Sequence, residues 1–257
     1  MTAAASIARS FSDRLADFLD RIECRRIDDA QELERVFRLR YDAYVREGAI
    51  PIGFSRRFAD AYDEAPNVSI LGVYIDGALA SSIRVHVASP DCPDAPGMGV
   101  FQDILQPELA RGRTITDPTR FVADQALARR HPELPYATTR LAFLAAEYFS
   151  ADIALATVRA EHQAFYRRTF GFAPLCPPRH YPSLTKPISL MAIERPSFST
   201  GVMLRYPFLR STAQERALLF GAAVAPVPTI AAPPLEAPDL EPQAFAIQAG
   251  QPMRAAA

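Results

Sequence analysis

The amino-acid sequence predicts an α+β fold, an α/β/α sandwich in which helices flank a central mixed, mostly antiparallel sheet of about seven strands. Apolar residues recur at helical spacing in some segments and alternate at strand spacing in others, and the two kinds of segment are interleaved. The dipeptide Asp76-Gly77 is a strong tight-turn signal that makes two strands antiparallel neighbours. The order of elements by itself fits several folds of this class.

The first half of the chain supplies two helices and a hairpin. The expected elements are a short amphipathic helix within residues 1–20, a strand at 22–27, a helix at 29–48 and strands at 68–75 and 79–87. Asp29 and Glu32 form a capping-box pattern that opens the second helix. One face of that helix is predicted to carry Leu33, Val36, Phe37, Arg40 and Tyr44.

The second half alternates helices with strands. After a loop rich in Pro and Gly, the pattern predicts a strand at 113–123, a helix at 135–149, a strand at 152–158, a helix at 160–170 and strands at 188–193 and 202–206. Pro118 interrupts the first of these strands, and Pro135 suits the first turn of the helix that it opens. Gly171 is the expected helix C-cap.

Composition narrows the class of protein. The chain has 257 residues, and its 28 Lys+Arg against 29 Asp+Glu give a net charge of −1, which disfavours a nucleic-acid binder. Three widely spaced Cys predict neither a disulfide framework nor a thiolate zinc site. No apolar run is long enough to cross a bilayer, and no signal-peptide core is present. We therefore expect a cytoplasmic protein without a membrane span.

The chain is predicted to form one domain and a tail. The domain covers residues 1–221, with its core at 22–195. Residues 222–257 contain seven Pro and twelve Ala but only four charged residues, so we expect this tail to be disordered. The alternative is an ordered tail that packs through Leu235, Leu240 and Phe245.

Several charged residues lie on otherwise apolar elements, where burial is costly unless charges are paired. Standard hydrolase, phosphate-loop and metalloprotease motifs are absent, and the four His are scattered, so we expect no metal site. Either a structural ion-pair network or simply exposed faces would explain the pattern without function. On these elements lie Arg40, Arg84, Asp117 and Arg120, with the polar Thr119 beside Arg120, and Asp60 and Asp63 lie in the intervening loop.

Five segments together resemble one known family. They are LRY at 39–41, FADAYD at 58–63, ILGVYIDG at 70–77, SIR at 82–84 and DPTRFVAD at 117–124. In this order they resemble the acyl-homoserine-lactone (autoinducer) synthases and the N-acyl amino acid synthases, both variants of the Gcn5-related N-acetyltransferase (GNAT) fold. The segment around Tyr166 and Gly171 also resembles a signature near the end of that fold.

The resemblance implies an N-acyltransferase that moves a medium or long acyl chain from a thioester to the amino group of an amino acid or similar small amine. No tightly bound cofactor is implied, because the acyl thioester is a co-substrate. Two departures refine this expectation. The chain has no Trp, which autoinducer synthases typically carry near residues 48–52, and residues 123–128 lack the usual pyrophosphate-binding loop. These departures favour an N-acyl amino acid synthase supplied by acyl carrier protein, without excluding coenzyme A.

Asp117 is the candidate general base, acting through a water, and Arg120 is the second candidate catalytic residue. The resembled family has Glu at this position, and Asp is one methylene shorter. A bulge beside Pro118 would let Asp117 and Arg120 face one cleft and would present backbone N–H groups to an oxyanion. Arg120 or Arg84 is expected to bind the carboxylate of the acceptor. The predicted substrate-binding set is Arg40, Asp60, Asp63, Arg84 and Thr119.

The acyl donor requires an apolar channel for its chain and a docking surface for its carrier. Phe101, Leu141, Leu144 and Leu155 are candidate linings of an acyl channel, and are equally compatible with ordinary core. Carrier proteins are acidic, so a basic surface would dock them. The candidates for docking are Arg129, Arg130, Arg167 and Arg168, with His131 beside them, and the alternative is that these side chains are simply solvated.

Two other functions remain open at this point. One is an acyl-homoserine-lactone synthase that uses S-adenosylmethionine, against which the missing Trp counts. The other is a non-catalytic module that binds an acyl carrier or a lipid amide. Asp117→Asn separates enzyme from module, because only an enzyme loses turnover.

Overall fold

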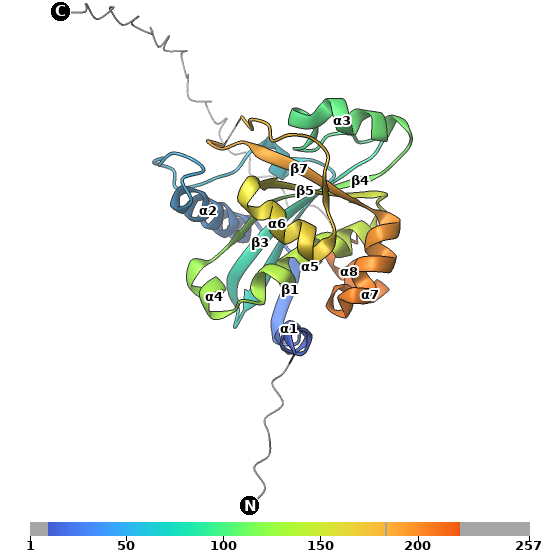
Figure 1. Ribbon diagram of the computed structural model, residues 1–257. Helices are drawn as coiled ribbons and strands as arrows, with labels where there is room; N and C mark the ends of the chain where they lie inside the picture. Colours follow the sequence, from blue (N-terminus) through green and yellow to red (C-terminus); the bar gives the residue numbers. More distant parts are fainter. Residues whose placement is uncertain (1–9, 183, 222–257) are drawn as a thin grey trace, which may run out of the picture. The chain divides into compact units, whose positions relative to one another are not determined.

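The computed structural model describes residues 10–182 and 184–221, and the predicted tail lies outside the described residues. One mixed sheet has seven strands in the order β1-β2-β3-β4-β5-β7-β6 (Figure 1). Only β4 and β5 are parallel, and all other neighbours are antiparallel, which confirms the predicted α+β class. The strands are Ile22–Arg26 (β1), Val68–Ile75 (β2), Ala78–Ala88 (β3), Ile115–Ala123 (β4), Ile153–Arg159 (β5), Ala173–Pro174 (β6) and Ile188–Glu194 (β7).

Helices connect these strands. The α-helices are Phe11–Leu19 (α1), Ala30–Arg46 (α2), Met98–Ala110 (α3), Gln125–Arg130 (α4), Leu134–Tyr148 (α5), Gln163–Phe165 (α6), Met203–Arg205 (α7) and Ala213–Phe220 (α8). Short 3-10 and π-helical turns lie at Ala61–Glu64 (η1), Ala160–His162 (η2), Tyr166–Phe170 (η3), Ser197–Val202 (η4) and Pro207–Leu209 (η5). No helix in the described part of the chain combines the length and hydropathy that a bilayer crossing requires.

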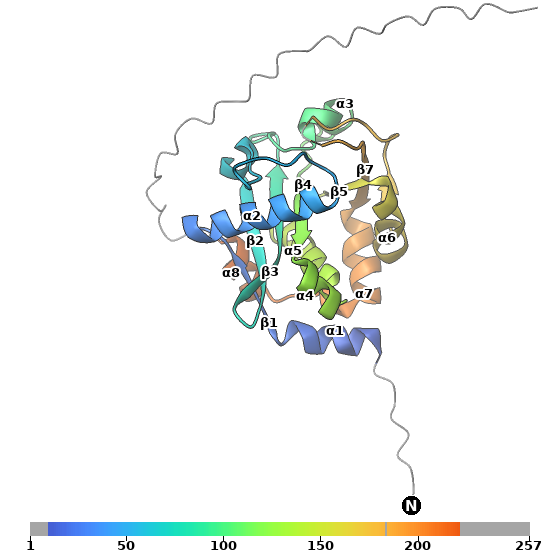
Figure 2. The ribbon, with the colours of Figure 1, turned by 90° about the vertical axis from the view of Figure 1, so that its left-hand side faces the viewer.

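The helices cover both faces of the sheet. In Figure 2, α2 crosses in front of β2, β3 and β4, and α5 lies behind them. One face packs against α2 and α3, and the other packs against α1, α5, α7 and α8. Because both faces are covered, β2 and β3 are buried along most of their length, and their polar residues are forced into the interior.

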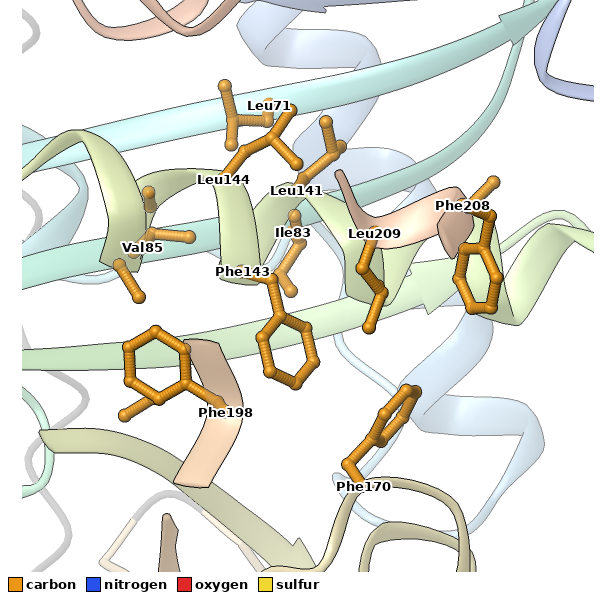
Figure 3. Close-up of a cluster of buried hydrophobic side chains, with 14 of the residues drawn as sticks. Leu71, Ile83, Val85, Leu141, Phe143, Leu144, Phe170, Phe198, Phe208 and Leu209 are labelled. Atoms are coloured by element: carbon orange, nitrogen blue, oxygen red, sulfur yellow. The ribbon is translucent and has the colours of Figure 1, made fainter. Parts of the chain in front are cut away.

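The main core lies on the α5 face (Figure 3). Leu71, Ile83 and Val85 project from β2 and β3 toward Leu141 and Leu144 of α5. Aromatic side chains from the C-terminal segments close this core, and the ring centroids of Phe143 and Phe198 are 6.1 Å apart. The burial of these apolar side chains holds the sheet and α5 together as one rigid support for the candidate site.

Local signals explain most element boundaries. Asp76 and Gly77 both adopt positive φ, at 50° and 76°, as a type I′ hairpin turn requires. The Asp29 side chain caps α2 by accepting hydrogen bonds from the backbone N–H groups of Gln31 and Glu32. Glu32 does not complete the predicted capping box. Its carboxylate instead accepts hydrogen bonds from Arg25 and Tyr74.

Five elements differ from the expectation. The predicted strand at 202–206 is helical, since a short apolar run fits a buried helix as well as a strand. Helix α3 was not predicted, because Pro107 lies inside it and its N-cap, Gly97, offers no side-chain cap. Helices α4 and α8 and the two-residue edge strand β6 were not predicted either.

The sheet opens between its two parallel strands. The pairing of β4 with β5 covers only Ile115 with Ile153 and Thr116 with Ala154. Beyond these pairs the strands diverge, so that one edge of β4 has no partner strand. Pro118, which cannot donate a ladder hydrogen bond, lies two residues past the last pair. The divergence creates the space that holds the candidate site.

Candidate active site

A cavity of about 700 Å³ lies where β4 and β5 part. Its walls are mainly apolar, and they come from both diverging strands, from α2 and from α5. Such a volume is typical of a binding site for a small molecule or a cofactor-sized ligand. Main contributors from the two strands are Pro118, Thr119, Arg120, Phe121, Val122, Ala154, Leu155, Ala156, Thr157 and Val158.

A β-bulge turns Arg120 toward this cavity. Ser82 pairs with Val122 and Arg84 with Thr119, so β4 contains one more residue than β3 between these pairs. Arg120 has a φ of 55°, which costs a non-glycine residue on the order of 1 kcal/mol. The predicted bulge therefore exists, but it lies at Arg120 and not beside Pro118.

Five predicted site residues form one buried network. Asp63 Oδ1 accepts hydrogen bonds from Arg40 Nη1 at 2.7 Å and from Arg84 Nη1 at 2.9 Å. Asp60 accepts from Arg84 Nη1 at 2.5 Å and from Arg120 Nη2 at 2.5 Å. The network therefore joins α2, η1, β3 and β4, and its three arginines exceed its two carboxylates by one positive charge.

The environment fixes the charges of this network. Burial alone would raise the pKa of Asp60, but the hydrogen bonds and charge of Arg84, with those of Arg120, bring it below its usual range. Burial lowers the pKa of Arg40 although the carboxylate of Asp63 opposes the effect. Arg120 also lies against the rings of Phe58 and Tyr44, at 4.2 Å and 5.5 Å from their centroids.

Asp117 lies apart from the network and is completely buried. Its Oδ2 accepts a hydrogen bond of 2.6 Å from the backbone N–H of Gly97, and its Oδ1 accepts one of 3.4 Å from the Thr157 hydroxyl. An added Cβ at Gly97 would lie 3.0 Å from Oδ2, so a larger residue there would force Asp117 to shift. Thr157 lines the cavity and is therefore the contact between Asp117 and that space.

Burial makes the carboxyl group of Asp117 a weaker acid than usual. It raises the pKa of the carboxyl to about 6, although Gly97, the charge of Arg84 and the hydroxyl of Thr157 act in the opposite direction. A carboxylate with a pKa near neutrality can both accept and release a proton under physiological conditions.

Only some of the predicted substrate-binding residues are accessible from the cavity. Thr119 and Arg120 line the cavity, whereas Arg40 and Arg84 are completely buried and lie outside its lining. Of the two arginines considered for the acceptor carboxylate, only Arg120 therefore faces the cavity. Asp60 and Asp63 hold the arginines in place.

The residues predicted to line an acyl channel and those predicted to dock a carrier protein differ in where the structure places them. Of the four candidate acyl-channel residues, only Leu155 lines the cavity. Phe101, Leu141 and Leu144 are ordinary core residues instead, because α3 and α5 pack them against the sheet. The four arginines considered for docking are all exposed, and Arg129 also lines the cavity.

Sequence reasoning missed several residues of the site. Thr157 and Gly97 position Asp117, but the only local signals were a polar residue in an apolar strand and a glycine in a Pro-rich loop. Tyr44 and Phe58 enclose Arg120, although only Tyr44 had been placed on a buried face. Among the described residues, no group of three or more His, Cys, Asp or Glu side chains has a geometry suited to a metal ion.

The family model of the N-acyl amino acid synthase FeeM matches residues 35–194, which include the network, the bulge and both diverging strands. This chain belongs to the FeeM N-acyl amino acid synthase family. It is therefore an acyltransferase, and the predicted resemblance is confirmed. No curated protein sequence gave a significant match.

Solved structures agree on the fold. FeeM from uncultured soil microbes, an N-acyl amino acid synthase, is 18% identical, with a TM-score of 0.60 over 72% of this chain and 96% of that one. The CoA-dependent acyl-homoserine lactone synthase BjaI is 18% identical, with a TM-score of 0.50 over 72% and 90%. MesI, also a CoA-dependent acyl-homoserine lactone synthase, is 19% identical, with a TM-score of 0.50 over 74% and 97%.

The network predicts a large loss of stability when its central carboxylate is removed. Asp63→Asn leaves Arg40 and Arg84 buried without their shared counter-charge, so we expect the free energy of unfolding to fall by about 3 kcal/mol. Urea denaturation measures this change. Asp42→Asn is the control, because Asp42 pairs with Arg56 at 3.8 Å on the surface and should contribute less than about 0.5 kcal/mol. Equal stability of the two variants would contradict the prediction.

Proposed function

We propose that this acyltransferase joins a medium or long acyl chain, held as a thioester, to the amino group of an amino acid or similar small amine. The observation that carries the proposal is the apolar cavity between β4 and β5, with Arg120 in its wall and Asp117 behind Thr157. An apolar space suits the acyl chain, and a cation suits the carboxylate of an amino acid.

The acceptor is positioned by Arg120. Asp60 engages Nη2 of its guanidinium, and the other guanidinium nitrogens have no hydrogen-bond partner among residues 10–182 and 184–221. Nη1 and Nε can each donate a hydrogen bond to an acceptor carboxylate. The excess positive charge of the buried network favours the same anion. This arrangement supports an amino acid over a neutral amine as acceptor.

The amino group must lose a proton to attack, because a free amine is largely protonated at neutral pH. Asp117 does not line the cavity itself. It therefore accepts that proton through a water or through the hydroxyl of Thr157, which does line the cavity. The nitrogen then bonds to the thioester carbonyl carbon, the carbon–sulfur bond breaks, and the thiolate leaves. No protein nucleophile is needed.

Two groups stabilise the reacting atoms. The free edge of β4 presents backbone N–H groups at the bulge, around Arg120 and Phe121, which are the candidate donors to the oxyanion. Tyr166 lines the cavity, and burial raises the pKa of its hydroxyl to about 12, so it stays protonated and can donate to the departing thiolate.

The donor is proposed to be acyl carrier protein. Helix α4 begins where the GNAT fold holds a coenzyme A pyrophosphate, but here Asp124 caps the helix by accepting from Leu127 N at 2.9 Å. The carboxylate occupies the Leu127 N–H and repels a pyrophosphate. The exposed arginines of α4 and η3 suit an acidic carrier. Coenzyme A remains the alternative, since BjaI and MesI are described as CoA-dependent.

Mass spectrometry of lipid extracts from expressing cells tests the function. Cells with the native chain should accumulate a new N-acyl amino acid, which identifies the acyl chain and the acceptor together. An acyl-homoserine lactone instead would establish the S-adenosylmethionine-dependent alternative, and the absence of any new amide would favour a binding module.

Asp117→Asn should lower turnover by about 10²–10⁴-fold while the protein stays folded, because an amide cannot accept the proton but can still accept the Gly97 hydrogen bond. Turnover of the purified variant with an acyl thioester measures the loss. Asp91→Asn, at an exposed position, is the matched control and should retain full turnover. Native turnover of the Asp117 variant would refute the assignment of the base.

The pKa of Asp117 predicts the pH dependence of the reaction. Below a pH of about 6 the carboxyl is protonated and cannot act as a base, so kcat/KM should rise as the pH increases through that value. Initial rates measured across this range in buffers of constant ionic strength check it. Asp117→Asn should lack this step, and a native profile without a rise near pH 6 would contradict the assignment.

The charge at the start of α4 predicts donor selectivity. Asp124→Ser keeps the helix cap but removes the negative charge, so kcat/KM for acyl coenzyme A should increase about threefold, with no change for the acyl carrier donor. Rates with both donors measure the ratio. Asp29→Ser makes the same exchange at the cap of α2 and should alter neither rate. Equal use of both donors by the native enzyme would contradict the proposal.

A further inference from the structure

The loop after α2 exposes two large apolar side chains. Ile52 is 84% exposed, and Phe54 is 109% exposed relative to its extended reference state. In Figure 1 this blue loop projects to the left of the strands. Full exposure of two neighbouring large apolar side chains is unfavourable in water, so the loop tip, defined here as residues 51–54, requires an explanation.

The backbone of this loop is held in place. The Tyr41 hydroxyl donates to the carbonyl of Gly53 and accepts from its N–H, both at 3.0 Å. Thr185 binds the base of the loop, with its N–H on the carbonyl of Ala49 and its hydroxyl on that of Gly48. The structure therefore supports the display of Ile52 and Phe54 instead of folding them inward.

The base of the loop borders the acyl cavity. Arg46, Glu47 and Ala49 line the cavity, and the first two are exposed, so the cavity reaches the surface beside the loop. At the other end of the loop, Phe58 packs on Arg120 of the site. An apolar ligand that enters or leaves the cavity at this side passes next to the loop tip.

Arginines flank the tip. Residues 48–59 contain Arg56 and Arg57 and no acidic residue, and Arg57 is paired with Glu34 at 2.8 Å, while Glu47 at the base of the loop is paired with Arg159. Arg56 exposes 76% of its side chain, and its contact with Asp42 is long and solvent-exposed, so Arg56 is available to another anion. Arg46, at the end of α2, is exposed and has no ion pair within the described ranges.

From these observations we propose that the loop tip inserts into the surface of an anionic lipid bilayer, with Ile52 and Phe54 at the acyl boundary and Arg46 and Arg56 at the headgroup phosphates. Apolar side chains that project from a pinned loop suit a fluid apolar phase, whereas a protein partner needs a complementary pocket. The surface would allow exchange of a long-chain product between the cavity and the bilayer. Vesicle binding itself does not depend on the proposed reaction, since it is measured without turnover.

Sedimentation of the full chain with lipid vesicles tests this proposal. One set contains phosphatidylglycerol and phosphatidylcholine in equal amounts, and the other contains phosphatidylcholine alone. The native chain should bind the anionic set more tightly, and Ile52→Ser with Phe54→Ser should weaken that binding by about tenfold or more. Arg56→Gln should reduce the preference for the anionic set.

Leu204→Ser with Leu218→Ser is the matched control, because these leucines are 66% and 79% exposed on α7 and α8, away from the loop. That control should bind vesicles as the native chain does. The proposal is overturned if the native chain does not sediment with anionic vesicles or if both double variants bind equally. Loss of affinity for acyl carrier protein in the tip variant, with vesicle binding unchanged, would assign the tip to the carrier instead.

Discussion

The buried ion-pair network is the interaction on which the candidate site depends. Arg84 cannot leave water without counter-charges, and it finds them in Asp60 and Asp63, which the turn η1 brings over the sheet. The same carboxylates hold Arg40 of α2 and Arg120 of the bulge. Because one network fixes four elements, the position of Arg120 in the cavity wall is set by the packing of the whole α2 face. Removing either carboxylate would leave buried arginines without a counter-charge.

The divergence of β4 from β5 adds the second constraint. It leaves one edge of β4 without ladder partners, which an ordinary sheet avoids, and this free edge faces an apolar cavity. The same gap separates Arg120, proposed to bind the acceptor, from Asp117, proposed to accept its proton. Arg120 offers positive charge in the cavity wall, whereas Asp117 lies behind Thr157, where burial raises its pKa toward neutrality. The groups proposed for binding and for proton transfer therefore lie in neighbouring but electrostatically distinct environments.

Surface features around the site suit the proposed acyl donor and product. A carboxylate caps α4, exposed arginines lie on α4 and η3, and the pinned loop after α2 displays Ile52 and Phe54 beside the cavity. These features lie on short connections around a rigid sheet, which can vary without disturbing the core. They suit a substrate that is apolar at one end and charged at the other.

The sequence by itself determined the class of fold, through local periodicity and the Asp76-Gly77 turn, and indicated the family through the five segments that resemble it. The cost of placing Arg40 and Arg84 on apolar elements indicated a charged network, but Asp117, which was counted with it, lies apart. Helix α3 escaped prediction because Pro107 and an uncapped start hide it, and Thr157 and Gly97 escaped because they reach Asp117 only across the fold. Tertiary structure alone decided that Arg120, and not Arg84, faces the cavity, since a bulge changes which side chains share a face and burial depends on every layer packed above it.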